Sequence, residues 1–89
     1  MIVEAVLAYI LINCVPGSEK DIILEIKKIS EVSEINGIMG RYDIFVKVSS
    51  RAVQGIDITV HKIRNIKGIN ASYSMPVLYG QGGTIDEQE

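Results

Sequence analysis

The side chains best suited to acid–base, nucleophilic or metal chemistry are scarce in this sequence, which has one histidine, His61, and one cysteine, Cys14. A catalytic histidine needs a partner that sets its tautomer and a neighbouring nucleophile or substrate, and no such arrangement accompanies His61. One histidine among scattered carboxylates also lacks the ligand spacing of a metal site. We interpret His61 as a surface residue and Cys14 as a small buried hydrophobe. The sequence therefore predicts no catalytic residue, no metal site and no cofactor.

Charge and hydropathy argue against two classes of partner. Nine Lys and Arg residues against eleven Asp and Glu residues give a net charge of −2, so the chain lacks the basic field that holds a phosphate backbone. The apolar segment 1–15 has no basic start, contains Glu4 and is too short to span a bilayer. We expect no direct contact with nucleic acid or membrane. A single cysteine suits a reducing cytoplasm, which is the location that we predict.

Two amphipathic helices are predicted. Ser18 is a suitable N-cap for a helix over about residues 19–30, and Ser49 and Ser50 can cap a second helix over residues 51–66. Each helix has one apolar face at spacings of three and four residues, which predicts that it packs on a sheet. These faces are formed by Ile22, Ile26 and Ile29 in the first helix and by Val53, Ile56, Val60, Ile63 and Ile66 in the second.

Four strands are predicted around these helices, over residues 3–15, 30–39, 42–48 and 69–77. The nearly continuous apolar run of the first strand is typical of a central strand. The second and third strands form an antiparallel pair joined at Gly40 and Arg41. Pro76 suggests an edge position for the last strand, since proline cannot donate a ladder hydrogen bond.

The order of the elements predicts an α+β fold of ferredoxin-like β-α-β-β-α-β type, with a four-stranded antiparallel sheet and two helices on one face. The other face is left bare. Because 47% of the residues are hydrophobic, we expect two copies to dimerise through their sheets as a dimeric α+β barrel. Residues 1–79 form the single domain in this interpretation, and residues 80–89 a flexible acidic tail.

Three segments, AYILINCVPGSEKDIILEIKKI, GRYDIFVKV and IRNIKGINASYSMPVL, together resemble the effector-binding (RAM) domain of the leucine-responsive regulatory protein/AsnC family of transcription regulators. The resemblance covers residues 5–78 and includes the turn at Pro16-Gly17 and the Gly-x-Tyr-Asp motif at residues 40–43. Lys67 departs from the family, which usually has Pro at this position, and the departure affects a turn rather than the pocket.

The resemblance implies a function. Family domains pair through their sheets, the dimers assemble into octamers or similar rings, and amino acid effectors bind between dimers. Full-length members begin with a helix-turn-helix, whereas this sequence starts almost directly on the first strand. We therefore expect a module that is not an enzyme, that binds an amino acid rather than DNA, and that modulates transcription regulation, co-assembling with full-length DNA-binding relatives.

The resemblance also implies where the effector binds. In the family, the glycine-containing hairpin and the last strand line the pocket, and the matching residues here are Gly40, Arg41, Tyr42, Asp43, Ser72 and Ser74. An α-amino acid needs backbone amides or a cation for its carboxylate and an acceptor for its ammonium group. Gly40 allows the backbone to approach a ligand closely, and Asp43 is the natural ammonium acceptor.

Each of these residues also has a purely structural interpretation. Gly40 can supply a positive φ angle to the turn and Asp43 can stabilise it. Arg41 can be a solvated turn residue, and the two serines can line a polar edge. Other side chains near the expected site are better explained as interface or core packing, namely Tyr9, Tyr73 and Met75.

Two other functions remain open at this point. Small dimeric α+β barrels include monooxygenase- and isomerase-like enzymes, which would bury His61 or Asp57 in a cavity inside one subunit. The chain could also be a purely structural assembly subunit without a ligand. A cavity inside one subunit would favour an enzyme over an effector-binding module. Failure to bind any amino acid in a ligand screen would favour a purely structural subunit.

Overall fold

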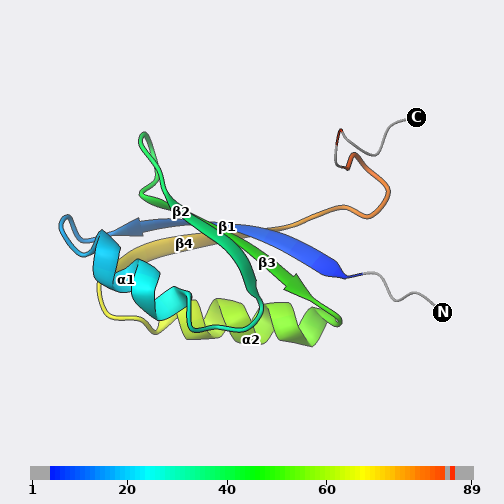
Figure 1. Cartoon of the computed structure of the whole chain (residues 1–89), viewed down its shortest axis with the longest axis horizontal. Coiled ribbons are helices and arrows are strands. Elements are labelled where there is room, and N and C mark those ends of the chain that lie inside the picture. The colour runs from blue at the N-terminus through cyan, green and yellow to red at the C-terminus, as the bar shows by residue number, and fades with distance from the viewer. Residues whose placement is uncertain (1–4, 84, 86–89) are drawn as a thin grey trace.

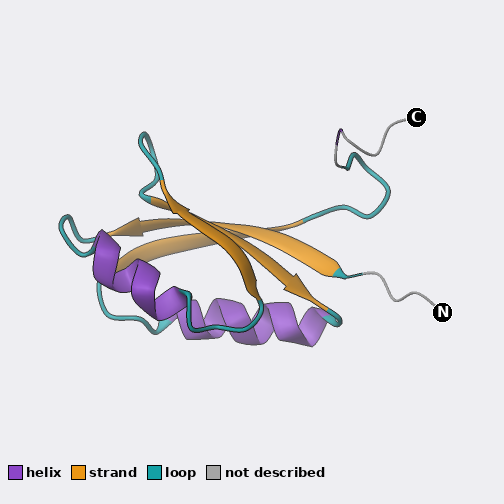
Figure 2. Cartoon of the chain, in the orientation of Figure 1, coloured by secondary structure: helices purple, strands orange, loops and turns teal. Residues whose placement is uncertain are grey.

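The protein consists of two layers, a four-stranded antiparallel sheet and two helices that cover one of its faces (Figure 1). This computed structural model describes residues 5–83 and residue 85. The strands are β1 (Val6–Cys14), β2 (Val32–Gly37), β3 (Ile44–Ser50) and β4 (Ile69–Pro76), and the helices are α1 (Glu19–Ile26) and α2 (Val53–Arg64). The order β-α-β-β-α-β and the one-sided layering confirm the predicted ferredoxin-like fold (Figure 2).

Strand β1 is a central strand of the sheet, as its apolar run predicts. The spatial order is β2-β3-β1-β4, so β1 pairs with β3 on one side and with β4 on the other. Its side chains alternate between buried and half-buried along its length. The buried set faces the helices and comprises Ala8, Ile10, Ile12 and Cys14. Strand β4 lies at an edge, which confirms the position that Pro76 suggests.

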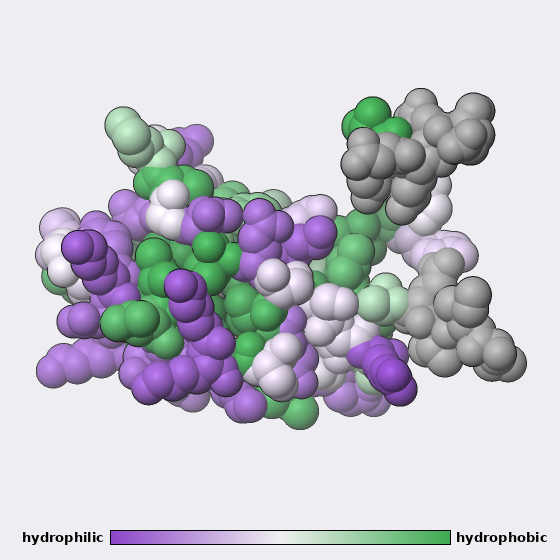
Figure 3. Space-filling model, viewed as in Figure 1, coloured by the Kyte–Doolittle hydropathy of each residue, from purple (hydrophilic) through white to green (hydrophobic). Residues whose placement is uncertain are grey.

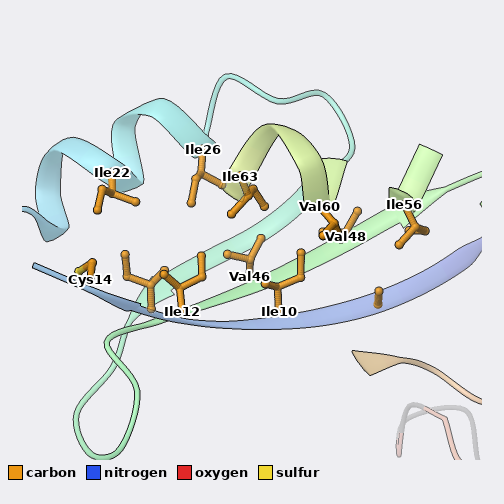
Figure 4. Close-up of a cluster of buried hydrophobic side chains, with 12 residues drawn as sticks. Ile10, Ile12, Cys14, Ile22, Ile26, Val46, Val48, Ile56, Val60 and Ile63 are labelled. Carbon is orange, nitrogen blue, oxygen red and sulfur yellow. The ribbon is translucent and has the colours of Figure 1, made fainter. Parts of the chain in front are cut away.

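The hydrophobic core lies between the sheet and the helices, and Figure 4 shows helix side chains pointing toward those of β1 and β3. Helix α1 contributes Ile22 and Ile26, and helix α2 contributes Ile56, Val60 and Ile63. These are the residues at the predicted three- and four-residue spacings. Val53 belongs to the predicted stripe but is exposed at the first residue of α2.

One predicted N-cap position is confirmed and the other is wrong. Ser18 is the N-cap residue of α1, but its hydroxyl donates to the Val15 carbonyl and makes no capping bond to an amide of the helix. Ser49 and Ser50 belong to β3, and the N-cap of α2 is Ala52, whose side chain has no oxygen to accept a bond. The preference of serine for helix starts is outweighed here by strand pairing. Ser49 and Ser50 pair with Leu7 and Val6 of β1, which extends β3 through both serines.

The first helix is also shorter than predicted. It ends at Ile26 rather than near residue 30. The amides of Lys28 and Ile29 donate to Glu25 and Ile26, three residues back, so the chain leaves the helix through tighter turns. At the end of α2, Gly68 has a φ of +100°, which confirms the predicted left-handed turn before β4.

Two sequence expectations concern the chain outside this core. No helix among the described residues is long and apolar enough to cross a membrane. Residues 80–83 and 85 are exposed, and the rest of the predicted acidic tail, residues 84 and 86–89, lies outside the described residues.

The packing of the core leads to one testable prediction about stability. Replacing Ile26, which is fully buried on α1, with Ala should lower the free energy of unfolding by about 2–5 kcal/mol, because a cavity remains where its side chain packs. The matched control is Leu24→Ala on the same helix, where the side chain is 59% exposed and the expected change is within about 0.5 kcal/mol. Urea denaturation of both variants measures the difference. Equal losses would contradict the assigned core face of α1.

Candidate functional site

The hairpin loop between β2 and β3 projects from the side of the sheet that the helices leave uncovered (Figure 1). It contains residues 38–43 and therefore the whole Gly-x-Tyr-Asp motif. Gly40 lies near its tip with a φ of +128°, a backbone conformation that other residues rarely adopt. Nothing lies within 4 Å of where a Cβ on Gly40 would stand. The backbone at this glycine is therefore open to an approaching molecule.

Asp43 anchors the hairpin to the end of β1. Its side-chain Oδ2 accepts a hydrogen bond of 2.9 Å from the Cys14 amide, and its own amide donates to the Ile12 carbonyl over 2.9 Å. Its carbonyl accepts from the Ile38 amide across the loop. These three bonds give Asp43 a structural role at the base of the loop. Because a carboxylate has two oxygens, Oδ1 remains able to accept a further donor.

Tyr42 faces the uncovered side of the sheet. Its ring contacts that of Tyr73 on β4 edge-on, with the ring centroids 5.7 Å apart and an angle of 67° between the planes. A second aromatic pair, Tyr9 and Phe45, stacks on the same face at 5.5 Å. Both the edge-on contact of Tyr42 with Tyr73 and the stacked contact of Tyr9 with Phe45 are stabilising arrangements of aromatic rings. Tyr73, interpreted from the sequence as packing, is thus the β4 residue that contacts the motif.

The two serines of the predicted site lie elsewhere. Ser72 pairs with Ile12 and Ser74 pairs with Ile10, whose side chains are buried under the helices. The serines therefore share the helix-covered side of β4, opposite to Tyr73. The Ser72 hydroxyl accepts a 3.0 Å bond from Arg64 Nε on α2. The structure brings Gly40, Arg41, Tyr42 and Asp43 together and separates Ser72 and Ser74 from them.

Asn13 is a residue near the site that the sequence interpretation did not include. It pairs with Ala71, and alternation along β1 places it on the same face as Leu11 and Tyr73. Its amide offers both donors and an acceptor. The sequence does contain an indication of this residue, because the polar Asn13 interrupts an otherwise apolar strand one position before Cys14.

The surroundings of the buried Cys14 thiol make it unreactive. Burial raises the pKa of Cys14, and the negative charge of Asp43 raises it further, while a hydrogen bond with Ser18 acts in the opposite direction. Since the thiolate is the nucleophilic form, a raised pKa keeps the group neutral. This agrees with the interpretation of Cys14 as a buried hydrophobe.

The two side chains that the enzyme interpretation places in a buried cavity lie instead on the surface. His61 and Asp57 are both exposed on α2, so neither lines a cavity between helix and sheet. Among the described residues, the only buried polar side chain is that of Thr59, whose hydroxyl donates to the Gly55 carbonyl. No group of three or more His, Cys, Asp or Glu side chains within the described part of the chain could hold a metal ion.

Sequence comparison decides the family. The profile of the family described as "Lrp/AsnC ligand binding domain" matches residues 7–80, which is most of the chain. The chain belongs to the Lrp/AsnC ligand-binding domain family. A comparison with curated protein sequences found no match.

Solved structures of Lrp/AsnC proteins and of similar chains share the fold. Hypothetical protein PHS023 from Pyrococcus horikoshii is 28% identical with a TM-score of 0.77, over 82% of this chain and 89% of that one. AsnC of E. coli is 25% identical with a TM-score of 0.77, over 90% of this chain and 56% of AsnC. The transcriptional regulator NMB0573 of Neisseria meningitidis, solved as a complex with L-Met, is 17% identical with a TM-score of 0.76, over 90% and 54% of the respective chains. At that identity the likeness shows the fold alone.

The anchoring of the hairpin yields a prediction. Asp43→Ala should lower the free energy of unfolding by about 1–3 kcal/mol, because the part-buried Cys14 amide loses its acceptor. Asp43→Asn keeps an oxygen acceptor and should lose less. Chemical denaturation of both variants beside an Asp57→Ala control, altered at an exposed position of α2, measures this order. An Asp43→Ala variant as stable as the control would show that the bond contributes nothing.

Proposed function

We propose that this chain binds an amino acid effector at the β2–β3 hairpin and modulates transcription regulation through self-assembly, without catalysis and without contacting DNA itself. The match of residues 7–80 to the Lrp/AsnC ligand-binding domain carries the proposal. The L-Met complex of the Neisseria regulator supports an amino acid as the ligand class. The net charge of −2 supports the absence of direct DNA contact.

The chemistry of the hairpin suits an α-amino acid. The open backbone at Gly40 and the exposed Arg41 offer a carboxylate both amide donors and a guanidinium group. Asp43 Oδ1 can accept the ammonium group while Oδ2 stays bonded to Cys14. Tyr42 and Tyr73 supply an apolar wall beside these groups. Ser72 and Ser74 are not part of this arrangement, because they lie on the helix-covered side of β4.

The uncovered face of the sheet supports pairing of two copies. It carries large apolar side chains that neither α1 nor α2 covers, namely Leu7, Tyr9, Leu11, Phe45, Tyr73 and Met75. Tyr73 is 50% exposed despite its size. A contiguous apolar face of this kind marks an interaction surface. A two-fold dimer would cover it in both copies at once, and the hairpins project from this same side (Figure 1).

The two alternative functions have less support. The enzyme interpretation requires His61 or Asp57 inside a subunit, and both are exposed. A purely structural subunit without a ligand would keep the apolar face but would leave the open backbone at Gly40 without a use. The ligand experiment separates this second alternative from the proposed function.

Thermal denaturation in the presence of each of the twenty amino acids tests ligand binding. We expect one or a few amino acids to raise the melting temperature in a concentration-dependent way, because a ligand that binds only the folded state stabilises it. Absence of any shift would favour the purely structural subunit.

The hairpin assignment is tested by titration calorimetry of Asp43→Asn with the amino acid found in that screen. Loss of the negative charge opposite the ammonium group should weaken binding by about tenfold or more, since hydrogen bonds to charged groups contribute about 1.5–3 kcal/mol. Asp57→Asn on α2 is the matched control and should bind normally. Unchanged affinity in Asp43→Asn would exclude Asp43 from the site.

Pairing through the sheet has its own test. Leu11→Asp places a charge in the middle of the uncovered face, where desolvation in an interface is costly. We expect light scattering to show a shift from dimer toward monomer, whereas Leu24→Asp, at an exposed position of α1, should leave the mass unchanged. A Leu11→Asp protein that stays fully dimeric would place the interface elsewhere.

A further inference from the structure

Asn13 is a polar residue on an otherwise apolar part of the uncovered face. It is half-buried, and alternation along β1 places its side chain on the same face as that of Leu11. Its side-chain amide makes no hydrogen bond with any described residue. Because no fully buried nitrogen or oxygen of a described side chain lacks a partner, the unpaired amide of Asn13 reaches the surface, where another molecule can contact it.

Asn13 lies directly beside the proposed ligand site. The Ile12 carbonyl accepts from the Asp43 amide, and the Cys14 amide donates to Asp43 Oδ2, both over 2.9 Å. Asp43 is therefore held against the two residues that flank Asn13 in β1. On its other side Asn13 pairs with Ala71 of β4, whose side chain is only a methyl group. No bulky side chain of β4 therefore stands across from the amide.

The surroundings of Asn13 are mixed in character. Tyr73 on the neighbouring strand shares the face of Asn13 and contacts Tyr42 of the hairpin. In Figure 3 the hairpin at the upper left presents hydrophobic and hydrophilic surface side by side. Ligand sites usually combine apolar walls with a few placed polar groups, and the polar groups set specificity. A ligand at this end of the sheet meets two aromatic rings and one free amide.

We propose that Asn13 selects the effector by a hydrogen bond to its side chain, so that the preferred ligands are amino acids with an amide or a hydroxyl group. The inference rests on the proposed function, because it adds a specificity-determining residue to the same site. An ammonium group bonded to Asp43 holds the Cα of the ligand close to Asn13, since Asp43 is bonded to both neighbours of that residue. The functional group of a short side chain then reaches the amide.

The chemistry of the Asn13 amide determines this class of ligand. An amide has both donors and an acceptor, so it pairs best with a group that also donates and accepts, as hydroxyl and amide groups do. A carboxylate side chain would bring a second negative charge close to Asp43. An apolar side chain would cover the amide of Asn13 without pairing with it, which costs free energy. Asparagine, glutamine, serine and threonine are therefore favoured over apolar amino acids of similar shape.

The folded chain alone gives Asn13 no structural role. Asparagine is depleted in strands, and an apolar residue here would continue the apolar run of β1 and enlarge the apolar part of the uncovered face. The register of β1 with β4 also shifts directly after Asn13, an irregularity that is frequent next to functional sites. A residue that lowers stability without a structural partner is typical of a functional position. Asn13→Leu should therefore leave the melting temperature of the ligand-free protein unchanged or raise it.

Titration calorimetry with amino acids of matched shape, threonine against valine and asparagine against leucine, tests the proposal. The wild-type protein should bind the polar member of at least one pair about tenfold more tightly, since an unpaired amide costs about as much as a lost hydrogen bond. Asn13→Leu should abolish or reverse this preference. Asn13→Val, a change to a strong strand former, should do the same and is a second test if leucine disturbs the packing. Asn65→Leu, at an exposed position at the end of α2, should keep the preference.

The outcomes separate this inference from the proposed function. If the wild-type protein binds none of the twenty amino acids, the proposed function is refuted and the role of Asn13 with it. If it binds apolar or charged amino acids most tightly, or if the preference for polar ones survives in Asn13→Leu, the inference alone is overturned. Light scattering of Asn13→Leu tests a hydrogen bond to the partner copy instead. A dimer that weakens in this variant while the ligand preference stays unchanged would assign Asn13 to the interface and overturn the inference.

Discussion

The one-sided cover of the sheet is the constraint on which the rest of this structure depends. Two helices of 8 and 12 residues shield one face of four strands, and the buried hydrophobic residues form a single cluster between these layers. No helix or strand among the described residues covers the opposite face, which carries Tyr9, Leu11 and Tyr73. Because burial of apolar area is the main favourable term in folding and association, a partner copy in the proposed dimer would gain most by covering this face.

Strand β1 connects the core to the proposed ligand site. Its alternate side chains fill the core, while the end of the same strand binds Asp43 through the Cys14 amide and the Ile12 carbonyl. The hairpin is thereby held at one end of the sheet and points to the uncovered side (Figure 1). A groove lined by Val15, Ile22 and Ile66 beside α1 lies near the same end, since Val15 follows β1 directly.

Much of this fold is predictable from local periodicity, and the site is less so. Spacings of three to four residues identified both helices, alternation identified the third and fourth strands, and a nearly continuous apolar run identified the first strand. Alternation in β4 separates Ser72 and Ser74 from Tyr73, but only the register with β1 decides which set faces the helices. The bond from Cys14 to Asp43 joins residues 29 positions apart, and no local pattern reveals it. Ser49 and Ser50 are good capping residues, yet pairing of β3 with β1 extends the strand through them.

The most direct test of the account is to map, residue by residue, where an amino acid binds. Two-dimensional NMR of the ¹⁵N-labelled protein, titrated with the amino acid that stabilises it, reports each backbone amide separately. The account predicts that the amides of Gly40, Arg41 and Asp43 shift with a common saturation curve, while those of His61 and Asp57 on α2 do not move. Shifts confined to α2 or to the groove beside α1, with an unperturbed hairpin, would contradict it.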